Sequence, residues 1–183
     1  MVTALPTAAD RYTPVAIAFH WLLALMIVGT FCFGLYMVGL PTSIGKLKLI
    51  NYHKWAGVTI LALSAARLLW RLTHRPPADL PMPAWQAQAA HLTHGALYLM
   101  FFVVPLVGWA YSSAAGFPIV VFGVLPLPDF VPVDKALAQA IKPWHERMAW
   151  VLALLVLGHL AAALKHHFID RDTLLDRMRP GRG

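Results

Sequence analysis

Four long blocks of apolar residues, separated by stretches with polar residues and prolines, dominate the pattern along the chain. A helix of about 20 apolar residues is long enough to cross the hydrocarbon core of a bilayer. The blocks therefore predict four transmembrane helices, at about residues 15–40, 52–72, 94–113 and 144–168. The stretch FPIVVFGVLPLPDFVP, before the last block, is apolar but too short and too rich in proline to span, so we expect an interfacial loop there.

The connections between the blocks are predicted to contain no long helix. Residues 41–52 are expected to form a loop, and the prolines of residues 73–90 indicate a connection with no long helix. DKALAQAIK, just before the last block, is expected to be a short helix within its connection. There is no internal repeat and no separate soluble domain, so the predicted fold class is an all-α membrane protein, a four-transmembrane-helix bundle that forms one domain over residues 1–183.

Composition supports a membrane protein. Hydrophobic residues make up 59% of the chain and charged residues 13%, whereas a soluble domain carries about 25% charged residues. The net charge of +7 does not indicate nucleic-acid binding, because the basic residues flank the apolar blocks and form no stripe on a soluble domain. Anionic lipid is the better-matched partner. The N-terminus lacks the cleavage pattern of a secretory signal, so the first block is expected to be a retained span.

The distribution of basic residues predicts an orientation. One set of helix ends, joined by the two terminal tails and the connection between spans two and three, holds Arg11, Arg67, Arg71, Arg75, Lys165, Arg171, Arg177, Arg179 and Arg182. The opposite set holds Lys46, Lys48, Lys54, Lys135, Lys142 and Arg147. Since cytoplasmic ends of spans are enriched in Lys and Arg, we expect the first set, and with it both termini, to be cytoplasmic.

Four histidines within the apolar blocks form a pattern of their own. His145 and His159 lie fourteen residues apart in the last block, which on a helix is about 21 Å of rise and an angular offset of only about 40°. Both imidazoles therefore face one side of that helix. By depth, His53 of span two should face His145 near the outer surface, and His20 of span one should face His159 nearer the cytoplasm.

Two pairs of facing imidazoles at two depths in a helical bundle predict two bis-histidine b haems. Such ligation leaves no open position on the iron and favours electron transfer. The chain has no C-x-x-C-H motif, so the haems are expected to be held without covalent bonds. A zinc site is disfavoured, because its ligands would have to converge and these histidines lie at opposite membrane faces. The alternative is a haem-free transporter or structural bundle in which the histidines only pack or hydrogen-bond.

Other residues are candidates for supporting roles. Gly57 and Gly158 leave room for a porphyrin near the histidines. His94, at the start of span three, is expected to bond a propionate or a quinone oxygen. Arginines and lysines near the expected haems are candidates to neutralise the propionates: Arg67, Arg71, Lys54 and Arg147. The remaining histidines are expected to be solvated or to contact headgroups at the cytoplasmic surface: His74, His91, His166 and His167.

Six segments together resemble the bacterial cytochrome b561 family of small di-haem, quinone-linked cytochromes, over nearly the whole chain. They are AIAFHWLLAL, NYHKWAGV, AARLLWRL, HLTHGALY, PWHERMAWV and GHLAAALKHH. The resemblance implies that the axial ligands of the haem irons are His20, His53, His145 and His159. It also implies a multi-pass protein of the bacterial inner membrane that exchanges electrons with ubiquinone, and it makes His166, in the KHH stretch, a candidate quinone contact.

The resemblance further implies a quinone-linked oxidoreductase, since some members of the family oxidise superoxide at the outer face. The basic residues of the outer side would suit such an anionic donor by electrostatic steering. The main alternative is an anchor subunit that receives electrons from a partner dehydrogenase or hydrogenase through the same haems. The expected partners are lipid, quinone and an electron donor, either superoxide or a protein. A homodimer is compatible with the sequence, which does not determine the oligomeric state.

Overall fold

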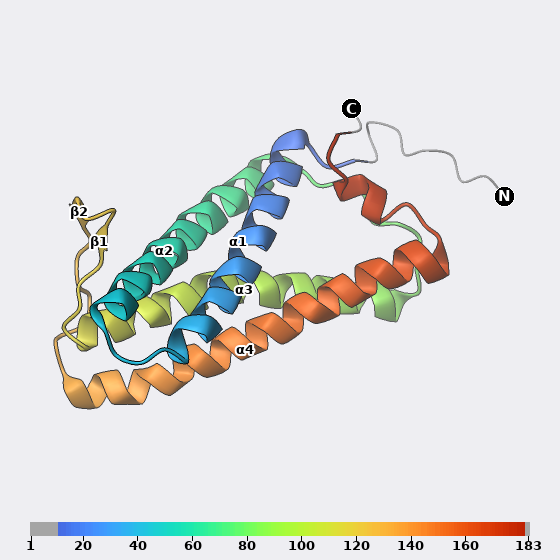
Figure 1. Ribbon diagram of the computed structural model, residues 1–183. Helices are drawn as coiled ribbons and strands as arrows, with labels where there is room; N and C mark the ends of the chain where they lie inside the picture. The colour runs from blue at the N-terminus through green and yellow to red at the C-terminus, as the bar shows by residue number, and fades with distance from the viewer. Residues whose placement is uncertain (1–10, 182–183) are drawn as a thin grey trace.

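Four long helices account for most of the computed structural model, which describes residues 11–181 (Figure 1). The helices are α1 (Pro14–Val38), α2 (Ile44–Thr73), α3 (Ala84–Ala114) and α4 (Lys135–Lys165). Between α3 and α4 lies a short antiparallel hairpin of β1 (Val120–Val121) and β2 (Leu125–Pro126), and α4 continues into a π-helical turn, η2 (His166–Asp170), before the 3-10 turn η3 (Leu175–Met178). All four helices are long and apolar enough to cross a membrane, which confirms the predicted fold class.

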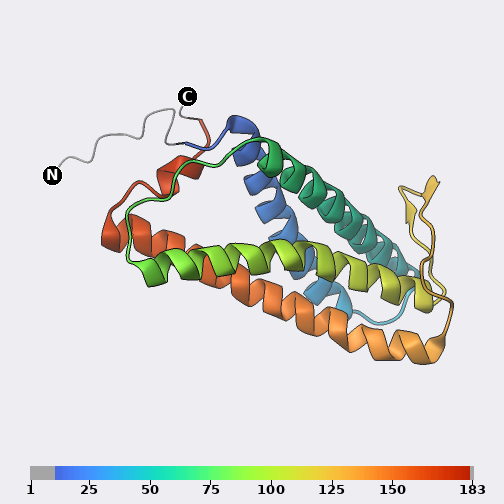
Figure 2. The same ribbon diagram turned by 180° about the vertical axis from the view of Figure 1, so that it is seen from behind.

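The helices pack as a bundle with two distinct ends. The main packing runs between α3 and α4, between α1 and α2, and between α2 and α3. The hairpin end gathers the end of α1, the start of α2, the end of α3 and the start of α4, and the terminal end gathers the opposite helix ends with η2 and η3 (Figures 1 and 2). A core of buried apolar side chains fills the middle of the bundle: Leu23, Ile27, Ile60, Leu97, Phe101, Val104 and Leu152.

The start of α2 differs from the prediction. Residues 44–52 are helical, not part of a loop, and the side-chain oxygen of Ser43 caps the helix by accepting a hydrogen bond from the Lys46 backbone N–H at 3.1 Å. Hydropathy marks only the part of a helix that lies in hydrocarbon. A capped helix continues past that boundary, since its backbone hydrogen bonds do not depend on the surrounding phase.

The same reason explains two further differences. α3 begins at Ala84, ten residues before the predicted span, directly after Pro83, and proline is compatible with the first turn of a helix. DKALAQAIK is helical as predicted, but it is the first part of α4 and continues through Pro143 into the last span. The carboxylate of Asp134 caps α4 by accepting hydrogen bonds from the N–H groups of Ala136 (2.7 Å) and Leu137 (3.1 Å).

Candidate functional site

His53 of α2 and His145 of α4 face each other near the hairpin end, as their depths predict. Their ring centroids lie 6.2 Å apart and the ring planes are at 89°. His145 Nδ1 donates a hydrogen bond to the Val104 carbonyl oxygen of α3 at 3.1 Å. Because a carbonyl only accepts, this bond places the proton on Nδ1 and leaves the lone pair of Nε2 free to bind a metal.

Two glycines make room for this pair. A Cβ atom added at Gly108 of α3 would lie 2.8 Å from His145 Cε1, and one added at Gly34 of α1 would lie 3.2 Å from His53 Cε1. The absence of side chains at these two positions therefore lets the imidazoles lie against the neighbouring helices. Nδ1 of His53 is buried and makes no hydrogen bond of ordinary geometry among residues 11–181.

At the terminal end, His20 of α1 and His159 of α4 form the second predicted pair, with centroids 6.1 Å apart and planes at 64°. A third imidazole, His94 of α3, lies even closer to His159, at 5.3 Å between centroids. Nη2 of Arg67 donates a hydrogen bond to Nδ1 of His20 at 3.2 Å. This end therefore combines three imidazoles with a guanidinium group.

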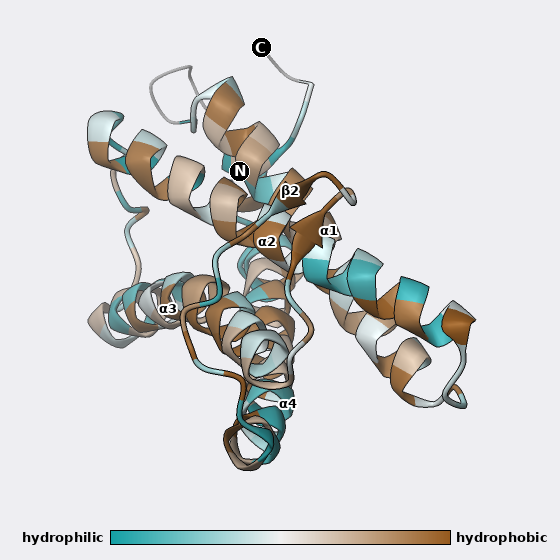
Figure 3. Ribbon diagram, turned by 90° about the vertical axis from the view of Figure 1, so that its left-hand side faces the viewer, coloured by the Kyte–Doolittle hydropathy of each residue, from teal (hydrophilic) through white to brown (hydrophobic). Residues whose placement is uncertain are grey.

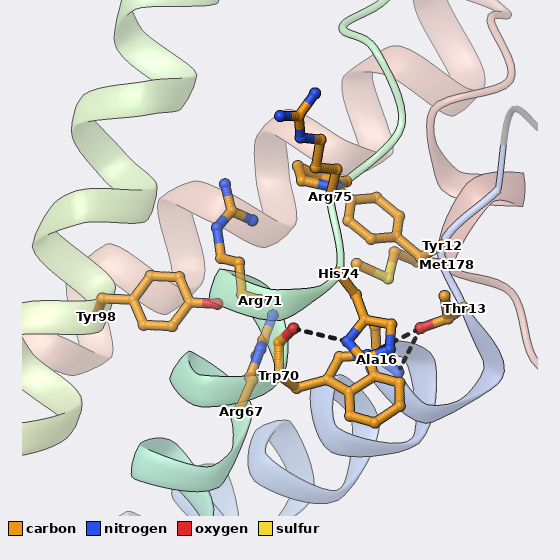
Figure 4. Close-up of a pocket in the computed structure, with 11 residues that line it drawn as sticks. Tyr12, Thr13, Ala16, Arg67, Trp70, Arg71, His74, Arg75, Tyr98 and Met178 are labelled. Atoms are coloured by element: carbon orange, nitrogen blue, oxygen red, sulfur yellow. Dashed lines mark hydrogen bonds between the residues drawn. The ribbon is translucent and has the colours of Figure 1, made fainter.

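Arginines converge beside this second pair. The guanidinium groups of Arg67 and Arg71 lie over the ring of Tyr98, at 5.5 and 5.9 Å from its centroid. With Arg75 and Tyr12 they line a cavity of about 30 Å³ that contains no carboxylate among its lining residues (Figure 4). Positive charge without an acidic partner, next to two aromatic rings, suits the binding of an anionic group.

The other sequence candidates lie elsewhere. Nζ of Lys54 donates hydrogen bonds to the backbone oxygens of Phe117 and Pro118, both at 3.2 Å. The guanidinium of Arg147 lies 5.4 Å from the centroid of the Trp144 ring.

His166 pairs with two carboxylates: its Nδ1 is 2.6 Å from Asp172 Oδ2 and 3.3 Å from Asp170 Oδ2. Of the candidates other than the four paired histidines, Arg67, Arg71 and His94 are therefore gathered near the terminal-end pair, while Lys54 and His166 are engaged in other contacts. The inner basic residue Arg182 lies outside the described residues.

The contribution of α3 and α1 to the hairpin-end pair was not predicted from the sequence. Gly34, Gly108 and the carbonyl of Val104 carried no recognised pattern. A signal was present, since each glycine interrupts an apolar span at the depth of the histidine that it meets. It could have been used only with knowledge of how each helix is rotated about its axis.

The spacing of the two pairs fits axial ligation of a metal. Two metal–imidazole bonds of about 2 Å and two ring radii of about 1.1 Å separate collinear axial imidazoles by roughly 6 Å between centroids. The observed separations are 6.2 and 6.1 Å. An added Cβ would meet nothing within 4 Å at Gly57 or Gly158, so no neighbouring side chain fills the space beside these glycines. The two imidazole donors of each pair and the separations between them fit haem.

A four-span bundle with facing imidazoles at two levels is the arrangement of a membrane cytochrome of b type. The comparisons with known proteins agree. The chain belongs to the prokaryotic cytochrome b561 family, whose model matches residues 11–181. It is accordingly a membrane protein of electron transport that binds b-type haem.

Three curated relatives cover almost the whole chain. Cytochrome b561 homolog 2 of Escherichia coli strain K12 is 38% identical over 174 residues, which are 92% of this chain and 91% of the relative. Cytochrome b561 homolog 1 of the same organism is 32% identical over 94% of this chain and 99% of its own length. A protein of Yersinia pestis named "Probable superoxide oxidase CybB" is 29% identical over 93% of this chain and 96% of its own length.

Proposed function

We propose that this protein holds two b haems without covalent bonds, one between His53 and His145 and one between His20 and His159, and carries electrons between them. The observation that supports this most directly is the near-equal separation of the two pairs, 6.2 and 6.1 Å. His94 is the weaker candidate ligand for the terminal-end haem, because its centroid lies only 5.3 Å from that of His159. The whole chain acts as one transmembrane unit, with each pair joining α4 to a different neighbour.

The surrounding residues set the chemical state of the imidazoles. The Val104 carbonyl fixes the proton of His145 on Nδ1, which is the tautomer that coordinates through Nε2. Arg67 has the opposite effect on His20, since a guanidinium donates only and makes Nδ1 of His20 an acceptor. Ligation by Nε2 of His20 therefore requires Arg67 to release Nδ1. The freed guanidinium can then pair with a haem propionate.

The cavity lined by Arg67 and Arg71 also supports the pairing of a guanidinium with a haem propionate. Arg67 and Arg71 meet at Tyr98 and have no carboxylate among the residues that line the cavity. Two guanidinium groups four residues apart on one helix repel each other by a few tenths of a kcal/mol, and a bound carboxylate removes this cost. Propionates of the terminal-end haem are the anions that this position favours. His94 supplies a further donor there, to a propionate or to a quinone oxygen.

The direction of electron flow follows from the two ends of the bundle. Bound haem supplies one-electron redox chemistry, and α4 places the two imidazole pairs about 21 Å apart along its axis. We assign the hairpin end to the outer side of the bacterial inner membrane and the termini to the cytoplasm, on the basis of the arginine bias. A haem held by His53 and His145 would then lie on the side of an outer one-electron donor, and a haem held by His20 and His159 would lie on the side from which ubiquinone would be reduced.

Superoxide is the donor that the comparisons favour, since one relative is named as a probable superoxide oxidase. Cations at the hairpin end would attract such an anion: Lys46, Lys48, Lys54, Lys135, Lys142 and Arg147. His166 is proposed as a quinone contact only on the basis of family resemblance, because its Nδ1 is already paired with Asp172.

The first test is a reduced-minus-oxidised spectrum of the purified protein with haem quantified per chain. Two haems per chain are expected, and a protein without b-type absorption would end the haem assignment. Replacing His53 or His145 by Ala should remove one spectral component, and replacing His20 or His159 should remove the other. Loss of the same component from His145→Ala and His159→Ala, with the other intact, would contradict the pairing by depth.

The second test concerns the donor. Purified protein in lipid is supplied with superoxide and ubiquinone, and quinone reduction is measured. Turnover by the isolated chain supports the superoxide assignment. Quinone reduction that appears only when a partner dehydrogenase or hydrogenase is added would instead identify the chain as an anchor subunit, with the same haems but a different donor.

A further inference from the structure

The hairpin between α3 and α4 exposes a group of apolar side chains. Residues 114–128 contain no charged residue. Phe122, Val124 and Leu125, at and beside the turn, are 71%, 79% and 59% exposed. The hairpin projects sideways from the hairpin end of the bundle, beside the start of α2 (Figures 1 and 2). Viewed from that end, both strands are coloured as hydrophobic (Figure 3).

Two side chains of α2 hold the hairpin and so relate its depth in the membrane to that of the helix. Nζ of Lys54 donates to the carbonyl oxygens of Phe117 and Pro118 at 3.2 Å, and Nε1 of Trp55 donates to that of Val120 at 2.8 Å. From Lys54 to the last residue of α2, Thr73, the helix rises about 30 Å, the thickness of the hydrocarbon core. Lys54 and Trp55, and with them the hairpin, therefore lie at the boundary between hydrocarbon and headgroups.

The backbone of the hairpin satisfies its own hydrogen bonds to a large extent. β1 pairs with β2 in the register Val120↔Pro126 and Val121↔Leu125. Leu127 N–H donates to the Ile119 carbonyl at 2.9 Å, and Val124 N–H to the Val121 carbonyl at 3.1 Å. Internal pairing lowers the cost of bringing peptide groups into an apolar phase, where an unsatisfied group costs several kcal/mol in the general case.

The turn holds Phe122 in an unfavourable backbone conformation. Its φ is +51°, followed by +74° at Gly123, so the pair forms the two central positions of the turn. The first position normally takes Asn, Asp or Gly, and a bulky residue there is strained. The aromatic ring of Phe122 packs against that of Trp55, with centroids 5.3 Å apart, and still leaves most of its surface exposed. A strained turn that presents an aromatic ring at a boundary indicates a role for that side chain.

We propose that this hairpin is an interfacial anchor that inserts Phe122, Val124 and Leu125 among the lipids of the leaflet at the hairpin end. Lipid is the occupant that the chemistry favours, because the tip carries no charge or hydrogen-bonding side chain with which to recognise a protein. The nearby cation Lys48 complements lipid phosphate groups at the same depth. The anchor fixes how the hairpin end sits relative to the membrane surface.

Site-directed spin labelling tests the anchor in the full-length, haem-loaded protein in nanodiscs of phosphatidylethanolamine and phosphatidylglycerol. Cys32 is first replaced by Ser, and single cysteines are introduced as Val124→Cys and Phe122→Cys. Leu25→Cys, in the middle of α1 and 72% exposed, is the lipid control. Gln139→Cys, near the polar start of α4, is the water control. The measurement is the accessibility of each label to oxygen, which partitions into lipid, and to a water-soluble nickel chelate.

Labels at positions 122 and 124 should show an oxygen-to-nickel ratio several-fold above that of position 139 and closer to that of position 25. A ratio at both positions equal to that of position 139 would overturn the proposal. The proposal would also be overturned if the labels were accessible to water in the isolated protein and became shielded only when a protein partner was added. Because Val124 has no strained backbone, its variant remains informative if Phe122→Cys fails to fold, and the b-type spectrum verifies folding in each case.

Discussion

Gly108→Ala tests whether α3 positions His145. The added Cβ would lie 2.8 Å from Cε1 and 3.0 Å from Nδ1 of His145, whereas ordinary contacts of a Cβ atom begin at 3.4 Å. The ring must therefore move by about 0.6 Å, the difference between 3.4 and 2.8 Å. The His145 ring cannot move freely, because its Nδ1 donates a hydrogen bond to the carbonyl oxygen of Val104, which lies one turn before Gly108 on α3.

Overpacking of this kind costs about 1–3 kcal/mol. The gain of about 0.5–1 kcal/mol from replacing glycine by alanine in a helix offsets only part of this cost. A net loss of one or two kcal/mol corresponds to a factor of about 5–30 in an equilibrium constant. We therefore expect the hairpin-end haem to bind at least several-fold more weakly in Gly108→Ala, while the terminal-end haem stays at full occupancy.

The assay is haem per chain together with a redox titration of the b-type absorption, in which the two proposed haems should appear as two components. Gly34→Ala, with its Cβ 3.2 Å from His53 Cε1, should give a smaller loss of the same component. Gly29→Ala, with nothing within 4 Å of the added atom, is the matched control and should leave both components unchanged. If Gly108→Ala behaved like Gly29→Ala, or if it removed the component that depends on His20, the positioning role of α3 would be refuted.

Substitutions at three further positions test the surroundings of the two pairs. Arg67→Gln removes a positive charge beside His20, so the midpoint potential and the occupancy of the terminal-end haem should fall. Arg67→Lys keeps the charge and should restore part of both. A redox titration with haem quantified per chain measures the two effects. The Cβ added by Gly158→Ala lies within 4 Å of no other protein atom, so the substitution should stabilise the haem-free protein slightly while weakening haem binding. If a haem titration gave the same affinity for this variant as for the wild type, the porphyrin would not occupy this space. Ser64→Ala removes a buried hydroxyl with no partner among the described residues, so thermal stability should be unchanged or higher.

Depth along a helix is the quantity that the sequence predicts well. The rise per residue is the same in every α-helix, so the positions of His20, His53, His145 and His159 in their spans predict that the imidazoles lie at two depths, with His53 level with His145 and His20 level with His159. The ends of α2, α3 and α4 were predicted less well, because hydropathy reports the hydrocarbon boundary and these helices continue beyond it.

Rotation of one helix against another is the quantity that the sequence does not provide. Gly34 and Gly108 became recognisable only once α1 and α3 were placed against His53 and His145. The same limitation affects His94, which lies within 5.3 Å of His159. Depth alone could not show whether α1 or α3 turns its histidine toward α4, since that choice depends on side-chain packing in the core.

α4 is the element on which both imidazole pairs depend. It supplies one histidine to each pair, whereas α2 supplies a partner only at the hairpin end and α1 only at the terminal end. Leu152 lies midway between His145 and His159 and is buried in the core, with 8% of its surface exposed. Its side chain therefore fixes the rotation of α4 at a point that both pairs share.

Leu152→Ala should consequently disturb both haem components. The cavity costs about 2–5 kcal/mol, and relaxation of α4 into it would move His145 and His159 together. Leu23→Ala is the matched control, because Leu23 is a fully buried leucine of the same core on α1, three residues from His20. It should alter mainly the terminal-end component in a redox titration. If Leu152→Ala changed only one component, each pair would be positioned by its neighbouring helix, and α4 would not be the element that couples them.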